Sequence, residues 1–579
     1  MTSTIQEKIA VLKLGSSVLP HIGAINNAIH EVYRYLREGY KVLVVISAFK
    51  DKTDELIKQT HQILDHSNNE PLHAEFAELL ATGETESASL FTIGLDKAGI
   101  KAKKLSHSCL KTSGHLLDST PIEIDTHLIN HLFKKYAVLV LPGFIGSNSD
   151  SNLTLLGRGG SDYTAVFAAY HLSATKCVLY KDTHGIFDKD PNLYKNTARC
   201  YADITFEDCL KIEHPVIQHK AINFCKQHQF KFEVKAIHHI GHTQVGSNKT
   251  KLKEKSNTPK KINVILLGLG TVGLGVYKHL EENKDHFNIV GICVKNIKKY
   301  LEIGINPELL SNDIQSILLR ECDVVIELIG GVTLPHEIIT QSIRKNRHII
   351  TANKALIAQQ GKNLFELATY YGVHIFYSAA VAGSIPILEN LAQFNKNHPK
   401  ITIKSVIGIL NGTCNFVLEK ITEGHQISEA LKIAQNLGFA EKDATLDLNG
   451  DDVAQKISII SQEAFGQAPD IISVLGIQHL TEKQVNDEKN RGKIIRLIAH
   501  CHKTKKGIEV DVRPLALDLE HPLAGVRYEN NAVLIHTEHD DLIRLEGKGA
   551  GRWPTAESVY ADLLALQNTF PPVYLEEAS

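Results

Sequence analysis

The chain has 579 residues, of which 43% are hydrophobic and 22% are charged, and its formal net charge is −2. This composition is typical of a globular protein with about three or four domains, and the balanced charge argues against a nucleic-acid partner. No apolar run approaches the ~18 residues that cross a bilayer, and the start of the chain lacks a signal-peptide pattern, so we expect no membrane partner. Nine cysteines without a CxxC pair predict reduced thiols in a cytoplasmic enzyme.

The first third of the chain predicts a parallel sheet covered by helices. Apolar runs at residues 9–14 and 42–46 flank a segment with helical spacing at residues 24–37. This order with short links is typical of α/β proteins, whose ligands bind at the carboxyl ends of the strands. A single lysine at a strand end is more often a surface charge than a ligand. The residues expected at the strand ends are Lys13, Gly15, Ser47 and Thr53.

A glycine-rich loop, Gly157–Asp162, favours a binding site at this edge of the sheet. It lies between an apolar run and a helical pattern. Glycines followed by Ser161 and Asp162 at a helix start are suited to holding a phosphate or a metal–phosphate, although an ordinary N-cap is the alternative. Arg158 offers a planar fork to an anion. A further predicted strand ends in two charged residues, Lys181 and Asp182.

These motifs are similar to those of aspartokinases, which have the amino-acid kinase fold. The resemblance covers about residues 8–246 of a first domain at residues 1–246 and implies phosphorylation of aspartate by ATP with Mg²⁺. Two departures are the string KLGSS at residues 13–17, where the family has KFGGTS, and His184 in place of an acidic residue. The matching strings are Gly157–Asp162, Gly83-Glu84, Ser47-Ala48 and Asp182 with Asp190-Pro191.

The resemblance also implies a role for individual residues of this domain. Lys13 would neutralise the transferring phosphoryl group, and Asp162 would position the reacting groups. The residues implied for the aspartate substrate are Thr53, Glu84, Arg158 and Ser161. The residues implied for the nucleotide are Gly15, Ser47, Lys181 and Asp182.

The segment at residues 247–261 is polar and rich in lysine, which predicts a solvated linker. In aspartokinases a pair of small regulatory ACT domains usually follows the catalytic domain. The linker is too short to fold one, so we expect this chain to lack them and its kinase not to be inhibited by threonine or lysine through that route.

A dinucleotide-binding turn begins the second half of the chain. The apolar run Val264–Leu267 opens directly onto Gly268-x-Gly270-x-x-Gly273 and then onto a helical pattern. Gly268 permits the tight turn, Gly270 lets backbone approach a pyrophosphate, and Gly273 lets the helix pack on the strand. A glycine-rich turn without a ligand is the alternative. The helix start that would offer amide groups to the phosphates contains Thr271 and Val272.

The end of the next predicted strand, at residues 288–294, favours NADP over NAD. An NAD site usually has an acidic residue near this point, but none occurs between residues 288 and 299. Basic residues suit the 2′-phosphate of NADP, and three stand here: Lys295, Lys298 and Lys299. We expect this dinucleotide-binding domain to span residues 262–377.

The last third of the chain contains a dense group of charged residues. Asp452 and Lys456 are spaced i, i+4 and therefore share a face if they lie on a helix. The predicted helix at residues 453–465 is largely apolar, so charges at its start would converge on a cleft. Acidic groups around one lysine suit a small substrate with an amino group and a carbonyl, whereas a solvated charged face is the alternative. The group comprises Glu441, Asp443, Asp447, Asp451, Asp452 and Lys456.

This half resembles homoserine dehydrogenases over nearly its whole length. The resemblance implies reduction of aspartate semialdehyde to homoserine by NADPH, with a catalytic domain at residues 378–579 that returns to the cofactor near its end. It also implies that this domain forms a homodimer or a higher homo-oligomer. The matching strings are Gly268–Gly273, Thr351–Lys354, Gly408–Thr413, Leu446–Lys456 and Gly547–Gly551.

The same resemblance implies the site residues. Lys354 and Lys456 would handle the carbonyl oxygen and its proton. Glu441, Asp447 and Asp452 would orient the amino group and the lysine, and Gly551 would contact the cofactor. The family also binds a monovalent cation through backbone carbonyls, although Ser378 stands here in place of its acidic ligand. The matching carbonyls belong to Val381, Gly383 and Ile385.

We therefore expect an α/β protein with an amino-acid kinase sandwich, a Rossmann domain and an α+β substrate and dimerisation domain. The favoured function is a bifunctional aspartokinase and homoserine dehydrogenase. One alternative is a homoserine dehydrogenase whose degenerate kinase domain only binds a ligand. A second alternative is a non-enzymatic nucleotide-binding scaffold. The presence of Lys354 and Lys456 together with the acidic group argues against it.

Overall fold

A computed structural model describes residues 8–63, 73–194, 197–212, 216–237, 241–253, 261–381, 383–549, 552–567 and 569–570. The chain divides into two compact units, with the division at residues 256 and 257. We call them the N-terminal unit and the C-terminal unit and describe each by itself. Among the described residues, none of the helices combines the length and the apolar character that crossing a membrane requires.

The N-terminal unit is built on a nine-stranded sheet with the strand order β13-β10-β12-β11-β9-β1-β2-β6-β3. The central strand β1 is parallel to both of its neighbours, so its carboxyl end and theirs lie at one edge. The strands are β1 (Lys8–Leu14), β2 (Tyr40–Ile46), β3 (Ala102–Lys104), β6 (Val138–Pro142), β9 (Lys176–Lys181), β10 (Tyr201–Ile204), β11 (Phe232–Ala236), β12 (His242–Val245) and β13 (Lys251–Leu252).

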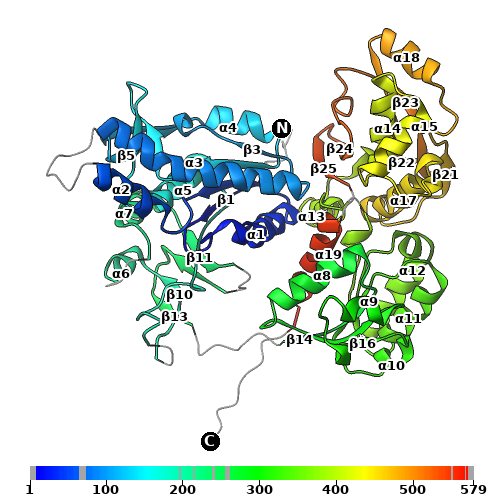
Figure 1. The fold of residues 1–579 in the computed structure, drawn as a ribbon, viewed down its shortest axis with the longest axis horizontal. Coiled ribbons are helices and arrows are strands. Elements are labelled where there is room, and N and C mark those ends of the chain that lie inside the picture. The colour runs from blue at the N-terminus through cyan, green and yellow to red at the C-terminus, as the bar shows by residue number, and fades with distance from the viewer. Residues whose placement is uncertain are drawn as a thin grey trace, which may run out of the picture. The chain divides into compact units, whose positions relative to one another are not determined.

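Helices cover both faces of this sheet (Figure 1). Val11 and Leu43 share one buried core with Ala165 of α5 and Ala221 of α7. On the opposite face, Tyr180 at the end of β9 donates a hydrogen bond of 2.7 Å to Glu31 of α1. The helices are α1 (Ile25–Arg37), α2 (Lys52–Ile63), α3 (His73–Lys97), α4 (Thr126–Phe133), α5 (Gly160–His171), α6 (Phe206–Leu210) and α7 (His219–His228).

A smaller four-stranded sheet, in the order β5-β4-β7-β8, completes the N-terminal unit. The hairpin of β4 (Leu110–His115) and β5 (Asp118–Ile124) is antiparallel, and β7 (Ile145–Ser147) pairs with β8 (Leu153–Leu155). The hydroxyl groups of Thr112 and Thr154 are 2.6 Å apart and buried between the two pairs.

The predicted solvated linker at residues 247–261 contains a short strand that belongs to the sheet of this unit, and residues 254–260 lie outside the described residues. Strand β13 pairs antiparallel with β10, and Leu252 is opposite Tyr201. Two polar side chains of the segment form hydrogen bonds to the rest of this unit. Ser247 donates to Asp203 at 2.7 Å, and Thr250 donates to Asp208 at 2.5 Å. Polar side chains can therefore tie such a segment to a sheet edge even when it has no apolar face.

The C-terminal unit begins with a six-stranded, all-parallel sheet in the order β16-β15-β14-β17-β18-β19. The strands are β14 (Ile262–Leu267), β15 (Phe287–Cys293), β16 (Leu310–Ser311), β17 (Val324–Glu327), β18 (His348–Thr351) and β19 (Ile375–Phe376). The helices that alternate with them are α8 (Thr271–Glu282), α9 (Ile297–Leu301), α10 (Ile314–Leu318), α11 (Thr333–Ile343) and α12 (Lys354–Tyr371). Parallel strands alternating with helices make this the dinucleotide-binding architecture.

The second sheet of this unit has the order β21-β23-β22-β20-β24-β25 and is antiparallel except for the β21–β23 pair. Its strands are β20 (Ile403–Ile409), β21 (Ile471–Val474), β22 (Lys493–Thr504), β23 (Gly507–Asp518), β24 (Asn530–Thr537) and β25 (Leu542–Lys548). Its helices are α13 (Ile387–Asn397), α14 (Gly412–Thr422), α15 (Ile427–Asn436), α16 (Thr445–Leu448), α17 (Asp451–Phe465) and α18 (Glu482–Asn490).

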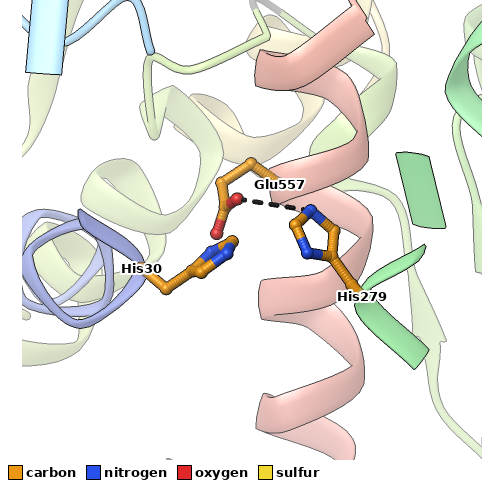
Figure 2. A group of neighbouring side chains, drawn as sticks. All are labelled: His30, His279 and Glu557. Carbon is orange, nitrogen blue, oxygen red and sulfur yellow. Dashed lines mark ion pairs between the residues drawn. The ribbon is translucent and has the colours of Figure 1, made fainter. Parts of the chain in front are cut away.

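The last helix, α19 (Arg552–Gln567), returns to the dinucleotide-binding sheet and lies beside α8 (Figure 1). Val559 and Leu563 belong to the same buried core as Val264 of β14. Between the two helices, His279 Nε2 lies 3.8 Å from Glu557 Oε2, which makes an ion pair when the imidazole is protonated (Figure 2). The predicted α/β fold class, with its kinase sandwich, Rossmann sheet and α+β part, is confirmed.

Candidate active sites

The glycine turn between β14 and α8 has the geometry that a bound dinucleotide requires. Gly268 has a φ of +99°, and a Cβ atom there would lie 2.9 Å from the carbonyl oxygen of Leu328. A Cβ at Gly273 would lie only 2.1 Å from the carbonyl oxygen of Gly268, whereas a Cβ at Gly270 would meet nothing within 4 Å. The first and third glycines therefore allow close backbone packing, and the second faces open space that a pyrophosphate can approach.

We expect alanine substitutions to separate these two roles. Gly273→Ala should lower the free energy of unfolding by about 1–3 kcal/mol, because the backbone of the turn must move to admit the methyl group. Gly270→Ala should leave the unfolding midpoint nearly unchanged, since Gly270 has a φ of −65°, but should weaken NADPH binding by roughly tenfold. Thermal unfolding and NADPH fluorescence titration of both variants test this, and equal stability losses would contradict it.

The predicted cofactor residues around this turn are exposed or partly exposed. Thr271 is the first residue of α8 and is exposed, and Val272 is partly exposed, so the amide groups of the helix start are not covered. Lys295 is exposed just beyond the end of β15. Gly551 lies outside the described residues.

Two lysines share one buried carboxylate at the junction of the two sheets of the C-terminal unit. Lys354, the first residue of α12, places its Nζ 2.5 Å from Asp452 Oδ1, and Lys456 of α17 places its Nζ 2.8 Å from Asp452 Oδ2. Burial acts to raise the pKa of the Asp452 carboxyl, but Lys456 and Lys354 overcome it, and the pKa lies well below its usual range. Asp452 is therefore an anion that holds both ammonium groups at one point.

Asn411, which the sequence did not single out as a functional residue, connects this group to Asp447. Its Nδ2 donates to Asp447 Oδ1 at 2.7 Å and to Asp452 Oδ2 at 2.8 Å, while its Oδ1 caps α14. Burial raises the pKa of the Asp447 carboxyl, and the hydrogen bond from Asn411 opposes that shift. An asparagine before Gly412-Thr413 is an N-cap signal, so its backbone role was predictable, but its contacts with two distant carboxylates were not.

Lys456 makes a second contact, donating from Nζ to the carbonyl oxygen of Leu410 at 2.9 Å. An ammonium group has three N–H donors, so one remains for a ligand. Lys354 is more open, with 37% of its side chain exposed. Glu441 is exposed, and within the described residues its carboxylate makes no hydrogen bond or ion pair with Asp452. The structure thus brings together Lys354, Asp447, Asp452 and Lys456 but leaves Glu441 at the surface.

The predicted cation site does not match its expected ligands. Gly383 O accepts a hydrogen bond of 2.7 Å from Ser558 Oγ, and Ile385 O accepts one of 2.8 Å from a backbone amide two residues later. Ser378 has no carboxylate, and its hydroxyl donates to Asp562 at 2.8 Å. These carbonyl oxygens already accept hydrogen bonds within the chain and the acidic ligand is replaced by a hydroxyl, so the residues present fit a cation poorly and we derive no step through one. The third carbonyl of the predicted set belongs to the buried residue Val381.

A second pair of lysines shares a carboxylate in the N-terminal unit. Lys13 Nζ lies 2.9 Å from Asp162 Oδ1, and Lys181 Nζ lies 2.9 Å from Asp162 Oδ2. The lysines come from the ends of adjacent parallel strands, β1 and β9, and the aspartate from the first turn of α5. Burial acts to raise the pKa of Asp162, but the two ammonium groups lower it to about 2. Burial lowers the pKa of Lys181 to about 8, against the attraction of Asp162.

Glycines shape the backbone around this group. A Cβ at Gly15 would lie 2.4 Å from Lys13 Nζ, so the absence of a side chain there leaves room for the ammonium group. Gly157 and Gly159 have φ values of +74° and +80°, which favour glycine, and Gly159 is the N-cap of α5. Ser161 is buried in the first turn of that helix.

Glu84 is a buried carboxylate near the end of β2. Its Oε1 accepts a hydrogen bond of 3.3 Å from the backbone amide of Ala48, and its Oε2 has no hydrogen-bond partner in the part of the chain that the structure describes. Burial raises the pKa of Glu84 to about 7. The segment that follows β2 and contains Ala48 also carries Ser47 and Thr53, which are partly exposed. An unpaired buried carboxylate beside partly exposed polar groups is suited to receiving an amino group.

Arg158 and Asp182 lie at the surface. The side chain of Arg158 is 96% exposed and reaches Asp54 only at 3.9 Å, a contact that contributes little to stability. Asp182 is exposed just beyond the end of β9. Both are therefore accessible to a ligand, and neither is fixed by the chain.

Comparison with known proteins identifies the families that the parts of the chain match. Residues 8–235 match the amino acid kinase family, residues 268–378 the homoserine dehydrogenase NAD binding domain, and residues 386–564 the homoserine dehydrogenase family. The homoserine dehydrogenase of Bacillus subtilis (strain 168) is 38% identical over 319 residues, which cover 53% of this chain and 73% of that protein. That of Synechocystis sp. is 33% identical over 317 residues and covers 52% and 72%.

A solved homoserine dehydrogenase from Thiobacillus denitrificans is 34% identical, covers 55% of this chain and 77% of its own, and has a TM-score of 0.50. The chain therefore belongs to the homoserine dehydrogenase family, and it joins that enzyme to an amino acid kinase domain in one polypeptide, as a bifunctional aspartokinase/homoserine dehydrogenase does.

Proposed function

We propose that the C-terminal unit reduces aspartate semialdehyde to homoserine with NADPH and that the N-terminal unit phosphorylates aspartate with ATP and Mg²⁺. The observation that carries the first reaction is the placement of Lys354 and Lys456 on one carboxylate, with Lys354 following directly on a strand of the dinucleotide-binding sheet. The two reactions flank one reduction, of aspartyl phosphate to the semialdehyde, which another enzyme must supply.

In the proposed dehydrogenase reaction the lysines and the carboxylates have different roles. The nicotinamide cofactor, when bound, supplies the hydride. The remaining N–H donor of Lys456 is suited to hold the carbonyl oxygen of the substrate, and the exposed ammonium of Lys354 to deliver or remove its proton. Asp452 holds both lysine side chains in place, and Asp447 offers a carboxylate to the substrate amino group, with Glu441 as a further acidic group on the loop before it.

The choice of NADP over NAD rests on the exposed lysines beyond β15. We expect Lys295→Ala to raise the KM for NADP about tenfold, because a charge-assisted hydrogen bond to a phosphate contributes about 1.5–3 kcal/mol. The KM for NAD, which lacks the 2′-phosphate, should change by less than about twofold. Initial rates of homoserine oxidation with each cofactor measure both values. A parallel rise for NADP and NAD would show that Lys295 does not recognise the phosphate.

The proposed kinase reaction rests on the two lysines that Asp162 holds together. Phosphoryl transfer depends mainly on positioned positive charge, and Lys13 and Lys181 supply two such charges at the carboxyl ends of adjacent strands. The unpaired Oε2 of Glu84 is suited to the amino group of aspartate, and Arg158, on the exposed glycine loop, to a carboxylate. Ser161 follows Arg158 by three residues and Thr53 lies in the first turn of α2, and both remain proposed substrate contacts. Asp182, Gly15 and Ser47 remain proposed nucleotide contacts.

The pKa of Lys181 predicts how the kinase depends on pH. Its ammonium group is charged below about pH 8 and loses its proton as the pH rises through that value. If the charge serves phosphoryl transfer, kcat should fall on the alkaline side with an apparent pKa of about 8. Lys181→Arg, whose guanidinium stays charged, should remove that alkaline limb, and a limb that persists in the variant would assign the titration to another group.

Two assays on the intact protein test the proposal itself. NADP-dependent oxidation of homoserine, followed at the nicotinamide absorbance, tests the dehydrogenase and excludes a non-enzymatic scaffold if it occurs. ATP-dependent formation of aspartyl hydroxamate tests the kinase. Homoserine oxidation without hydroxamate formation would favour the alternative, a dehydrogenase whose kinase domain only binds a ligand.

A further inference from the structure

We propose that Glu327 is a positioning residue for the dehydrogenase reaction, because it connects the glycine loop after β17 to the loop that carries Lys354. The inference rests on the proposed dehydrogenase function. Glu327 is the last residue of β17 and is fully buried, which is rare for a carboxylate outside a functional site or an ion pair. No motif in the sequence pointed to it.

Both oxygens of this carboxylate are bonded to neighbouring loops. Oε1 accepts hydrogen bonds from the backbone amides of Ile329 at 2.8 Å and Gly330 at 3.0 Å. Oε2 accepts a hydrogen bond of 2.7 Å from the hydroxyl of Thr351. Thr351 is the residue opposite Glu327 on the adjacent parallel strand β18, so the two side chains leave the sheet at the same edge.

A continuous series of hydrogen bonds leads from Thr351 to the catalytic lysine. Thr351 Oγ1 accepts from the amide of Asn353 at 3.0 Å. Asn353 Nδ2 donates to the carbonyl oxygen of Gly331 at 2.6 Å, and its Oδ1 caps α12 by accepting from Leu356 N at 3.1 Å. Lys354 is the next residue, so the start of its helix is fixed on one side by Asn353 and on the other by its pair with Asp452.

The glycine loop is held on one side and open on the other. Gly330 and Gly331 have φ values of +72° and +82°, and a Cβ at either would meet nothing within 4 Å. Ligands of parallel sheets bind at this carboxyl edge, so the open side is where a nicotinamide cofactor would lie. Glu327 therefore sets the distance between the cofactor loop and Lys354, and a shift of that distance costs rate even when both partners remain bound.

An isosteric substitution changes the hydrogen bond of one carboxylate oxygen of Glu327 and keeps those of the other. In Glu327→Gln the amide oxygen can still accept from Ile329 and Gly330, but the –NH₂ group can only donate to Thr351 Oγ1, so the hydroxyl proton of Thr351 loses its acceptor. We expect kcat for homoserine oxidation to fall about tenfold or more, with the Kd for NADPH within about twofold of the native value. Thr351→Val should act similarly, whereas Thr351→Ser, which retains the hydroxyl, should restore most of the rate.

The matched control is Asp323→Asn, which precedes the opposite end of β17 and accepts a hydrogen bond of 2.8 Å from the amide of Asn263. It should leave kcat unchanged. Steady-state rates, NADPH fluorescence titration and unfolding midpoints are measured on all four variants and the native enzyme. The proposal is overturned if Glu327→Gln has an unchanged kcat, with or without a weaker Kd for NADPH. If that variant does not fold, equal kcat values in Thr351→Val and Thr351→Ser overturn the proposal instead. A native enzyme that binds NADPH but oxidises no homoserine would instead refute the proposed function.

Discussion

Replacing Lys456 by alanine is expected to lower the rate of homoserine oxidation by about 10²–10⁴-fold, the range that general acid–base groups contribute. The variant loses the ammonium group that bonds both Asp452 and Leu410 O, and with it the N–H donor that remains for the substrate oxygen. Aspartyl hydroxamate formation should stay within about twofold of native, because Lys456 belongs to a different compact unit from Asp162.

The structural cost of this substitution must be separated from the catalytic one. Removing one partner of a buried ion pair destabilises a protein by about 3–5 kcal/mol, and Lys354 compensates part of that loss because it also contacts Asp452. Lys456→Arg is the matched variant, since it keeps the charge but changes the geometry. If Lys456→Ala binds NADPH natively and still oxidises homoserine at a native rate, the assignment of Lys456 is wrong.

Replacing Asp162 by alanine is expected to abolish hydroxamate formation, with a loss of about 10³-fold or more. Without the carboxylate, the ammonium groups of Lys13 and Lys181 repel each other and lose the position that Asp162 gives them. Lys13→Ala should have a similar effect, because it removes one of the two charges. Homoserine oxidation should remain near native in both variants.

The result also decides between the kinase and a domain that only binds a ligand. ATP and aspartate affinities of Asp162→Ala are measured by calorimetry beside the rates. Loss of rate with retained binding supports catalysis, whereas a native protein without hydroxamate activity favours the degenerate domain. Because Asp162 is fully buried between its two lysines, Asp162→Asn is the control that keeps the side-chain volume.

Much of the fold could be predicted because its signals are local. The apolar run before Gly268 and the spacing of the three glycines indicated a strand, a turn and a helix, and the structure has all three. The loop Gly157–Asp162 likewise opens α5. The linker was predicted less well, because the pairing of Leu252 with Tyr201 depends on a strand fifty residues away rather than on the composition of the segment.

The sequence predicted most residues of the candidate sites but not the contacts between their side chains. Lys13, Asp162 and Lys181 were each expected at strand or helix ends, yet nothing in their spacing shows that one carboxylate bonds both lysines. Asp452 and Lys456 could be paired from their i, i+4 spacing, but Lys354 comes from another helix, α12. Glu441 was expected in the same group, and its side chain is exposed instead.

The amino-acid order alone thus established the parallel strands around the two glycine-rich loops, the glycine turns and the chemical types of the site residues, since periodicity and backbone freedom are properties of short segments. Folding in three dimensions determined which charges meet. The contacts of Asn411 with two carboxylates and of Glu327 with Thr351 join residues on separate elements, so only the register of neighbouring strands and the packing of α17 against the sheets bring them within hydrogen-bond distance.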